Sequence, residues 1–420
     1  MSSNNLPILN VFLYIDPAST SALLYILIAI GATLLFTLRG FFYKIKNFIL
    51  GKGFVRNNEF EDIDIFFYSE GRQYWAVFYP IIKALEKKNI ECVYLTSDNT
   101  DPGLEYKSEF LKSKYIGNLT ITSVYLNKLK AKFLGMTMPQ LDVMMIKRSK
   151  NVQHYCHIIH SPVDVFFYKK FAFDYFDSVF CSGPHQIDNI RYLEQKRNLN
   201  KKEIYSTGLT YFDKMNEDIS SINFKNDKSR PIVLLAPSWK SDCILNRFGS
   251  DFVRFLLKDP DYDIILRPHP QTYISYPEIM LKIEKDFIEE KRLVIDRNPS
   301  GIDSMIKADV MISDFSGIIW DYAFLFSKPV LILDVPLTLD GFEATELDRN
   351  NFWDVNHREN IGEIFSENDI ESISLKVRNL IENLPKNSIK ELREKYVFNW
   401  NMAGEVSAKQ IIDIVNKLNN

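Results

Sequence analysis

The chain has 420 residues, with 51 Lys and Arg against 54 Asp and Glu, so its formal net charge at pH 7 is -3. The hydrophobic share of 46% and the charged share of 25% are typical of globular proteins and exclude a disordered or collagen-like chain. The near-neutral balance also argues against nucleic-acid binding, which needs a basic surface. At roughly 100–200 residues per domain, the length predicts two domains with two cores.

An uncharged apolar segment lies near the N-terminus. Residues 21–38 carry no charge, and together with the residues back to Pro17 they are long enough to cross a bilayer as a helix. Five basic residues follow before any acidic one: Arg39, Lys44, Lys46, Lys52 and Arg56. This asymmetry predicts a single-pass helix in the cell membrane, with the rest of the chain in the cytoplasm. A buried core helix and a monotopic hairpin that includes residues 6–15 are the alternatives.

Short apolar runs alternate with amphipathic segments through the rest of the chain. The first series of predicted strands is Asp62–Tyr68, Glu91–Thr96, Asp142–Ile146, Tyr155–Ile159 and Ser178–Cys181, with helices around 78–85 and 184–191. The second series of strands is Ile232–Leu235, Asp263–Leu266, Leu293–Ile295, Val310–Ile312 and Val330–Leu333, with helices near 252–257, 302–306 and from residue 318. Such alternation is typical of βαβ units, in which helices cover both faces of a parallel sheet.

The polar stretch 216–230 separates the two series, so we expect an α/β protein with two Rossmann-like domains that face each other across a cleft. The predicted parts are the membrane anchor with its basic segment at 1–56, the first domain at 57–225, the second at 226–385 and C-terminal helices at 386–420. Ligands of such sheets bind beyond the carboxyl ends of the strands. Neither a GxGxxG nor a Walker-type loop occurs, which argues against nicotinamide enzymes and P-loop kinases. The four cysteines form no CxxC pair and are predicted to be buried, reduced hydrophobes.

The segment 310–333 reads as strand, polar turn, helix and strand. Its turn contains Ser313, Asp314, Ser316 and Gly317. A helix N-terminus with small hydroxyl residues suits an anion, and Gly317 permits close backbone approach. Asp321 lies one turn further on and is expected to face the same cleft. Ordinary N-capping by these residues is the alternative.

Two further strands end in polar residues. The strand 263–266 ends in Arg267-Pro268-His269-Pro270, where Arg267 and His269 are positioned to bind a pyrophosphate; a structural histidine is the alternative. The strand 232–235 leads into Pro237, Ser238 and Lys240, which are candidates for phosphate binding. The alternative there is a loop with a packed tryptophan.

Three histidines, His154, His157 and His160, stand three residues apart. On a strand this spacing alternates faces, and no carboxylate or cysteine completes a ligand set, so we predict no metal site. His160 stands where the strand meets the turn and is the candidate general base. His157 is the second choice, and His154 is expected to be exposed.

Taken in order, the segments APSWK, RPHP, SDFSGIIWDYA and NWNMAGEVSAKQII resemble those of the CDP-glycerol glycerophosphotransferases, over about residues 60–415. The resemblance implies a GT-B fold, with an acceptor domain, a donor domain and C-terminal helices that pack back on the first domain. His160 matches the family's catalytic histidine in a stretch that here lacks its glycine. The family's donor-binding stretches match Pro237, Ser238, Arg267, Pro268, His269, Asp314, Ser316, Gly317 and Asp321. Tyr211 stands where the family often has an arginine.

The resemblance implies transfer of glycerol phosphate, or a similar polyol phosphate, from a CDP-linked donor to a hydroxyl of a lipid-linked or polymeric acceptor, with release of CMP. It implies a reaction without a cofactor, in which His269, Arg267 and Lys240 neutralise charge. Two alternatives remain: a GT-B glycosyltransferase or 2-epimerase acting on a nucleotide sugar, and a non-catalytic anchored scaffold.

Overall fold

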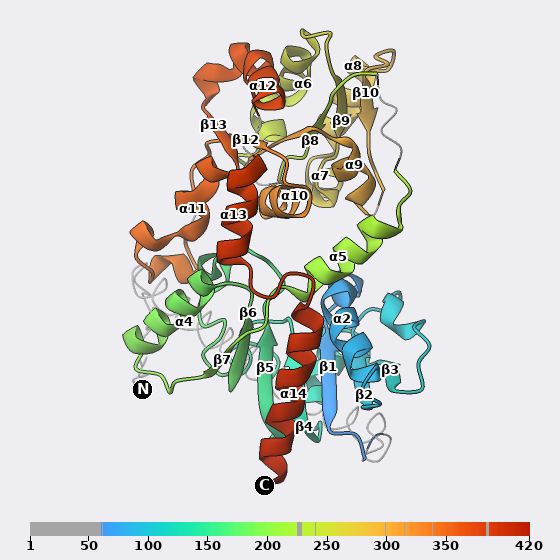
Figure 1. The fold of residues 1–420 in the computed structure, drawn as a ribbon, viewed down its shortest axis with the longest axis vertical. Helices are drawn as coiled ribbons and strands as arrows, with labels where there is room; N and C mark the ends of the chain where they lie inside the picture. The colour runs from blue at the N-terminus through green and yellow to red at the C-terminus, as the bar shows by residue number, and fades with distance from the viewer. Residues whose placement is uncertain are drawn as a thin grey trace, which may run out of the picture. The chain divides into compact units, whose positions relative to one another are not determined.

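A computed structural model describes residues 60, 62–224, 229–239, 241–298, 300–314, 316–337, 339–383 and 386–420. The predicted membrane anchor and its basic segment lie outside the described residues. Among the residues that are described, no helix combines the length and the apolar character needed to cross a membrane. Residues 58–420 form one unit, built around two parallel sheets (Figure 1).

The first sheet has seven strands in the order β3-β2-β1-β4-β5-β6-β7. These strands are β1 (Ile65–Ser69), β2 (Cys92–Thr96), β3 (Leu111–Tyr115), β4 (Ala131–Met136), β5 (Val152–Ile158), β6 (Ser178–Cys181) and β7 (Glu203–Ser206). The helices of this half are α2 (Trp75–Glu86), α3 (Leu119–Leu126), α4 (Pro184–Lys196) and α5 (Thr210–Ser221). The central strands are buried along their whole length, as continuous apolar runs in a parallel sheet should be.

The second sheet has six strands in the order β10-β9-β8-β11-β12-β13. These strands are β8 (Ile232–Leu235), β9 (Asp263–Leu266), β10 (Leu293–Ile295), β11 (Val310–Ser313), β12 (Val330–Leu333) and β13 (Gly362–Phe365). The helices are α6 (Ile244–Leu257), α7 (Pro270–Ser275), α8 (Pro277–Asp286), α9 (Ile302–Lys307), α10 (Ile318–Phe326), α11 (Trp353–His357), α12 (Ile373–Glu382), α13 (Lys386–Tyr396) and α14 (Ala403–Asn419). All pairings within both sheets are parallel, which confirms the predicted α/β class.

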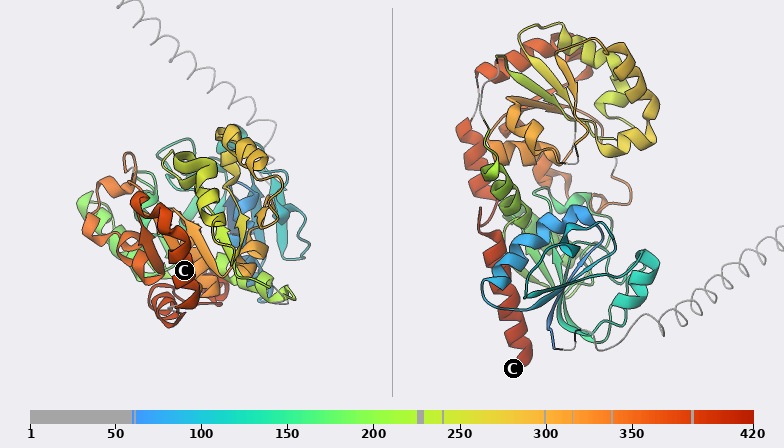
Figure 2. Two further views of the ribbon diagram at one scale, coloured as in Figure 1. Left: turned by 90° about the horizontal axis from the view of Figure 1, so that it is seen from above. Right: turned by 90° about the vertical axis from the view of Figure 1, so that its right-hand side faces the viewer.

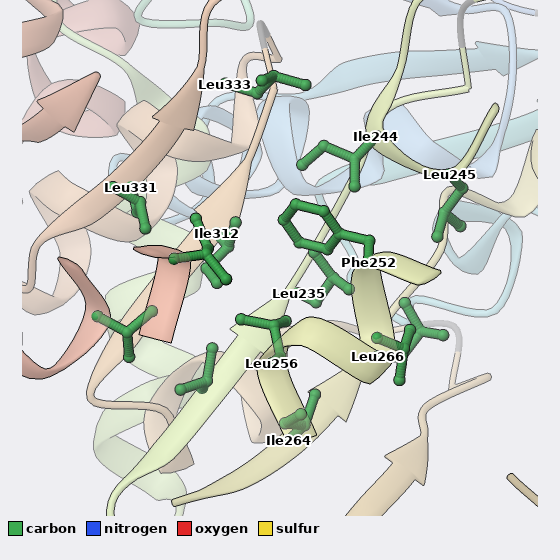
Figure 3. Packing of buried hydrophobic residues seen from close by; sticks show 14 of the residues in the cluster. Leu235, Ile244, Leu245, Phe252, Leu256, Ile264, Leu266, Ile312, Leu331 and Leu333 are labelled. Carbon is green, nitrogen blue, oxygen red and sulfur yellow. The ribbon is translucent and has the colours of Figure 1, made fainter. Parts of the chain in front are cut away.

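Each sheet is covered by apolar side chains on both faces. Figure 3 shows one face of the second sheet, where Phe252 of α6 packs among Leu235, Ile264 and Ile312 of three neighbouring strands. Because the strands are short, this interlocking of helix and strand side chains is the main source of burial that fixes them. The loops that follow the strands are therefore held at defined positions.

The last helix, α14, packs on α2 of the first sheet (Figures 1 and 2). Its Ile411 and Ile414 join the core that contains Phe78 and Ile81. A Cβ at Gly404 would lie 2.6 Å from the Cβ of Pro80, so the approach of the two helices requires glycine at this position.

A segment that follows β12 also crosses to the first half. Leu339, Ala344 and Leu347 share a core cluster with residues of the first sheet. Phe352 stacks on Phe166, with ring centroids 4.4 Å apart and an interplanar angle of 7°. This segment brings residues 342–354 to the carboxyl end of β5.

Two predictions about the first half are wrong. Residues 142–146 form a turn rather than a strand, with Asp142 at φ 63° and Met144 61% exposed. His154, expected to be exposed, is 8% exposed and its Nε2 lies 2.8 Å from Ser178 Oγ. The first prediction failed because composition alone cannot distinguish an apolar run that has no partner strand from a true strand. The second failed because Ser178, on the neighbouring strand β6, covers His154.

Candidate functional site

A cavity of about 370 Å³ lies at the carboxyl ends of strands of the second sheet. Strands β8 and β11 are neighbours there, and the strand order reverses between them, which is the switch point where open parallel sheets bind ligands. The lining residues are Ser161, Val163, Phe167, Ser238, Trp239, His269, Ser316, Gly317, Ile319, Trp320, Phe342 and Asp354. The first three follow β5 of the first sheet, so both halves of the chain contribute.

The turn between β11 and α10 forms one wall of the cavity through Ser316 and Gly317. A Cβ at Gly317 would lie 3.7 Å from Val163 Cγ1 and 3.8 Å from Ser161 Oγ, so the start of α10 faces the loop after β5. The N-terminus of an α-helix carries partial positive charge and unpaired N–H groups. This wall therefore has the polarity that suits an anionic group; the anion site itself stays a prediction.

Asp314, in the same turn, is fully buried and does not line the cavity. Its carboxylate accepts hydrogen bonds from the backbone N–H of Ser238, at 3.1 and 3.2 Å, and of Ile244, at 3.1 Å. The N–H of Ser238, which we expected to be available to phosphate, is thus already bonded. Asp314 therefore holds the loop between β8 and α6 in place. Ser238 still lines the cavity.

His269 lines the cavity from the end of β9 and is exposed. Its Nδ1 accepts a hydrogen bond from the backbone N–H of Gln271 at 3.1 Å, so the neutral ring carries its proton on Nε2. Partial burial lowers the pKa of His269, which favours that neutral form at pH 7. The ring of Trp239 lies beside it, with centroids 6.2 Å apart. His269 is therefore a hydrogen-bond donor at the mouth of an aromatic-lined cavity.

Arg267 lies behind the cavity wall. Its Nη1 donates to Asp296 Oδ2 at 2.7 Å, and the two side chains are 14% and 5% exposed. Burial tends to raise the pKa of Asp296, but bonds from Ser304, Asn298 and Arg267 lower it below its usual value. Arg267 thus forms a buried ion pair rather than a wall of the cavity. Pro237 is buried in the neighbouring loop, and Lys240 lies outside the described residues.

Asp321 also lies away from the cavity lining. It hydrogen-bonds to Tyr211 of α5, and its buried Oδ1 has no partner among the residues described. Burial raises the pKa of Asp321 to about 7, although the bond from Tyr211 lowers it in part. The pair joins α10 to α5.

His160 lies two residues after the end of β5 and directly before Ser161, next to the cavity but not in its lining. Burial lowers its pKa to about 4, so the imidazole is neutral at pH 7, and it is a weaker base there than a free imidazole. Its Nδ1 is buried without a partner among the described residues, and the ring packs edge-on against Tyr74 at 4.9 Å.

His157, the second choice for the base, belongs to the core. It is 0% exposed and makes edge contacts with the rings of Tyr168, Phe173 and Phe176. Burial lowers its pKa to about 3, although a backbone hydrogen bond at Met138 opposes the shift. The described part of the chain contains no cluster of three or more metal-ligating side chains.

Several lining residues were not predicted. Phe167 follows the histidine strand, while Phe342 and Asp354 come from the crossing segment after β12. Sequence order alone does not indicate that this segment returns to β5. The only local signal was the dense aromatic pair Phe352-Trp353, which is typical of core rather than of a site.

Two Rossmann-type parallel sheets with a shared cavity at a switch point define the general class as an α/β protein with a GT-B-like fold. Residues 180–337 match the family described as CDP-Glycerol:Poly(glycerophosphate) glycerophosphotransferase. The match confirms the resemblance drawn from the sequence and the expectation of a glycerophosphotransferase-type enzyme. The matched segment begins within β6 and continues through β12, and thus contains Ser238, His269 and the start of α10.

Solved structures share the fold. The wall teichoic acid polymerase TagF has a TM-score of 0.55 at 13% identity, over 91% of this chain and 99% of that chain. A TagF structure soaked with CDPG has a TM-score of 0.57 at 14% identity, over 92% and 99%. The UDP-GlcNAc 2-epimerase of Methanocaldococcus jannaschii, in complex with UDP-GlcNAc and UDP, has a TM-score of 0.55 at 14% identity, over 84% and 100%. No curated protein sequence matches the chain.

Proposed function

We propose that the protein transfers glycerol phosphate, or a similar polyol phosphate, from a CDP-linked donor to a hydroxyl of a lipid-linked or polymeric cell-envelope acceptor. One observation carries this proposal. The family-matched segment supplies Ser238, His269 and the α10 start to the cavity that Ser161, next to His160, closes from the other half. Anion-binding groups and a candidate base thus meet at one place.

In the proposed reaction, His160 accepts the proton of the acceptor hydroxyl. The acceptor oxygen forms a bond to the distal phosphorus of the CDP-polyol, and the bond from that phosphorus to the bridging oxygen breaks. The electron pair leaves with CMP. Phosphoryl transfer of this kind depends mainly on alignment and on neutralisation of charge. His269 Nε2–H and the N-terminus of α10 supply donors to the phosphoryl oxygens.

The proposal includes anchoring in the cell membrane by residues 17–38, with the two sheets on the cytoplasmic side. It rests on the charge asymmetry around that segment. The protein would then meet a lipid-linked acceptor at the membrane surface in which the acceptor's lipid is embedded.

The test is release of CMP from CDP-glycerol by the full chain in the presence of membranes that contain the acceptor. We expect His160→Ala to lower the rate by roughly 10²–10⁴-fold, because a general base is lost. We expect His269→Ala to lower it by roughly 10²–10³-fold, because a donor to the developing charge is lost. His154→Gln is the matched control. It changes another histidine, on β5, and the glutamine can still hydrogen-bond to Ser178, so this variant should retain full activity. Normal CMP release by both alanine variants would refute the proposal.

The fold similarity to a UDP-GlcNAc 2-epimerase, at the same TM-score as TagF, supports one alternative. A nucleotide-sugar enzyme would use the same switch-point cavity. Turnover of a UDP-sugar, with no CMP release from CDP-glycerol or CDP-ribitol, would favour this alternative. Failure to bind any nucleotide would favour an anchored scaffold.

A further inference from the structure

Two buried carboxyl groups meet beside the cavity. Asp164 lies in the loop after β5, and Asp354 lies in α11 at the end of the crossing segment. Both side chains are 0% exposed. The Asp164 N–H donates to Asp354 Oδ2 at 2.8 Å, and the Trp353 N–H donates to Asp164 Oδ2 at 3.2 Å. A carboxyl group of each half thus accepts a hydrogen bond from a backbone N–H of the other half.

The two carboxyl groups have unequal partners. Asp164 also accepts from the Val165 N–H at 2.6 Å and, with both oxygens, from Asn189 Nδ2 at 2.8 Å. Asp354 accepts from two backbone N–H groups, those of Asp164 and of Asp354 itself, and its Oδ1 is buried without a partner among the described residues. A carboxylate is favoured where donors surround it, so the negative charge belongs on Asp164 and the proton on Asp354.

The charged groups around the pair support this assignment. Burial, followed by the charge of Asp164, raises the pKa of Asp354 well above its usual value, and Arg358 opposes the shift. Burial raises the pKa of Asp164 to about 7, but its bonds from Asn189, Trp353 and Val165 oppose that shift. A neutral Asp354 carries an O–H donor on the oxygen that no other group uses.

Asp354 is also a lining residue of the cavity, together with Ser316, Gly317 and His269. An ionised carboxylate at this place would repel a phosphate, whereas a carboxylic acid would donate to it. Building on the proposed function, we propose that Asp354 is a neutral carboxylic acid that donates a hydrogen bond to a phosphoryl oxygen of the diphosphate ligand. Asp164 is the positioning residue that keeps the proton there.

The test compares Asp354→Ala and Asp354→Asn in the full chain by calorimetric titration with CDP, inorganic pyrophosphate and cytidine. Asparagine retains an acceptor for the Asp164 N–H and offers an N–H donor in place of the acid. We therefore expect Asp354→Asn to bind all three probes within about threefold of wild type. A lost hydrogen bond to a charged group predicts that Asp354→Ala weakens CDP and pyrophosphate by roughly 10–100-fold and leaves cytidine unchanged.

Infrared difference spectra give a readout that needs no ligand. The C=O stretching band of a protonated carboxylic acid should be present in wild type and absent in Asp354→Asn. Absence of that band in wild type would refute the inference. So would tighter CDP binding by Asp354→Asn, equal loss of cytidine and CDP by Asp354→Ala, or wild-type affinity in Asp354→Ala.

Loss of CMP release in Asp354→Asn with full CDP affinity would also overturn a role limited to hydrogen bonding, because it would indicate proton transfer. Wild-type protein that binds neither CDP nor pyrophosphate would refute the inference together with the nucleotide site. Pyrophosphate binding that depends on Asp354, without any CMP release from CDP-glycerol, would refute the proposed function and leave this inference intact.

Discussion

Replacing His157 by phenylalanine should retain activity and change how stability depends on pH. The wild-type imidazole is enclosed by Tyr168, Phe173 and Phe176 and has a pKa of about 3, against about 6.5 in an unfolded chain. Between these values the unfolded state binds more protons, so stability falls as the pH falls. From pH 7 to pH 5 the lost free energy of unfolding is about 2 kcal/mol from this group alone.

The assay is urea denaturation of the full chain at pH 7 and pH 5, with CMP release measured on the same samples. His157→Phe should lose about 2 kcal/mol less than wild type over this range, since it removes the titrating ring. An unchanged pH dependence would show that His157 is not held neutral by burial. Loss of CMP release in a folded His157→Phe variant would show that His157 rather than His160 serves as the base.

Three further substitutions test groups that lie behind the cavity, each by urea denaturation and nucleotide titration. Arg267→Ala should lower the free energy of unfolding by about 3–5 kcal/mol, because the carboxylate of Asp296 is left buried and unpaired; a loss of nucleotide affinity without loss of stability would contradict this. Asp314→Ala should cost about 2–4 kcal/mol and weaken nucleotide binding, since two buried N–H groups lose their acceptor; unchanged values of both would argue against its role in shaping the loop. Tyr211→Phe should raise the pKa of Asp321 further, because the bond that lowers it is lost, and should cost about 1–2 kcal/mol; an unchanged stability would show that the pair contributes little.

Most of the second sheet was predictable from its sequence. The bounds of β8, β9, β10 and β12 agree with the predicted strands, because each is a short apolar run between turn residues. The strands that escaped prediction are β3, β4, β7 and β13. In β3 two lysines interrupt the apolar pattern, and β7 and β13 are four-residue edge strands with a charged residue in each.

The site was predictable where it depends on strand ends. Ser238, His269, Ser316 and Gly317 were expected at the cleft because each belongs to a loop that follows a parallel strand, and these four residues line the cavity. Arg267 also directly follows a strand, and Asp321 lies in the first turn of α10, yet each pairs with a buried partner whose position only the tertiary structure reveals. Asp354 could not be foreseen, because it reaches the cavity through a crossing segment with no strand-end signal.

The reciprocal bonds between Asp164, Asp354 and the backbone of the opposite half also limit how the enzyme opens. Separating the halves at this seam would exchange both hydrogen bonds for bonds to water, at a net cost of about 0.5–3 kcal/mol each. The stack of Phe166 on Phe352 lies along the same seam. We therefore expect any hinge motion that admits a donor to leave this edge intact.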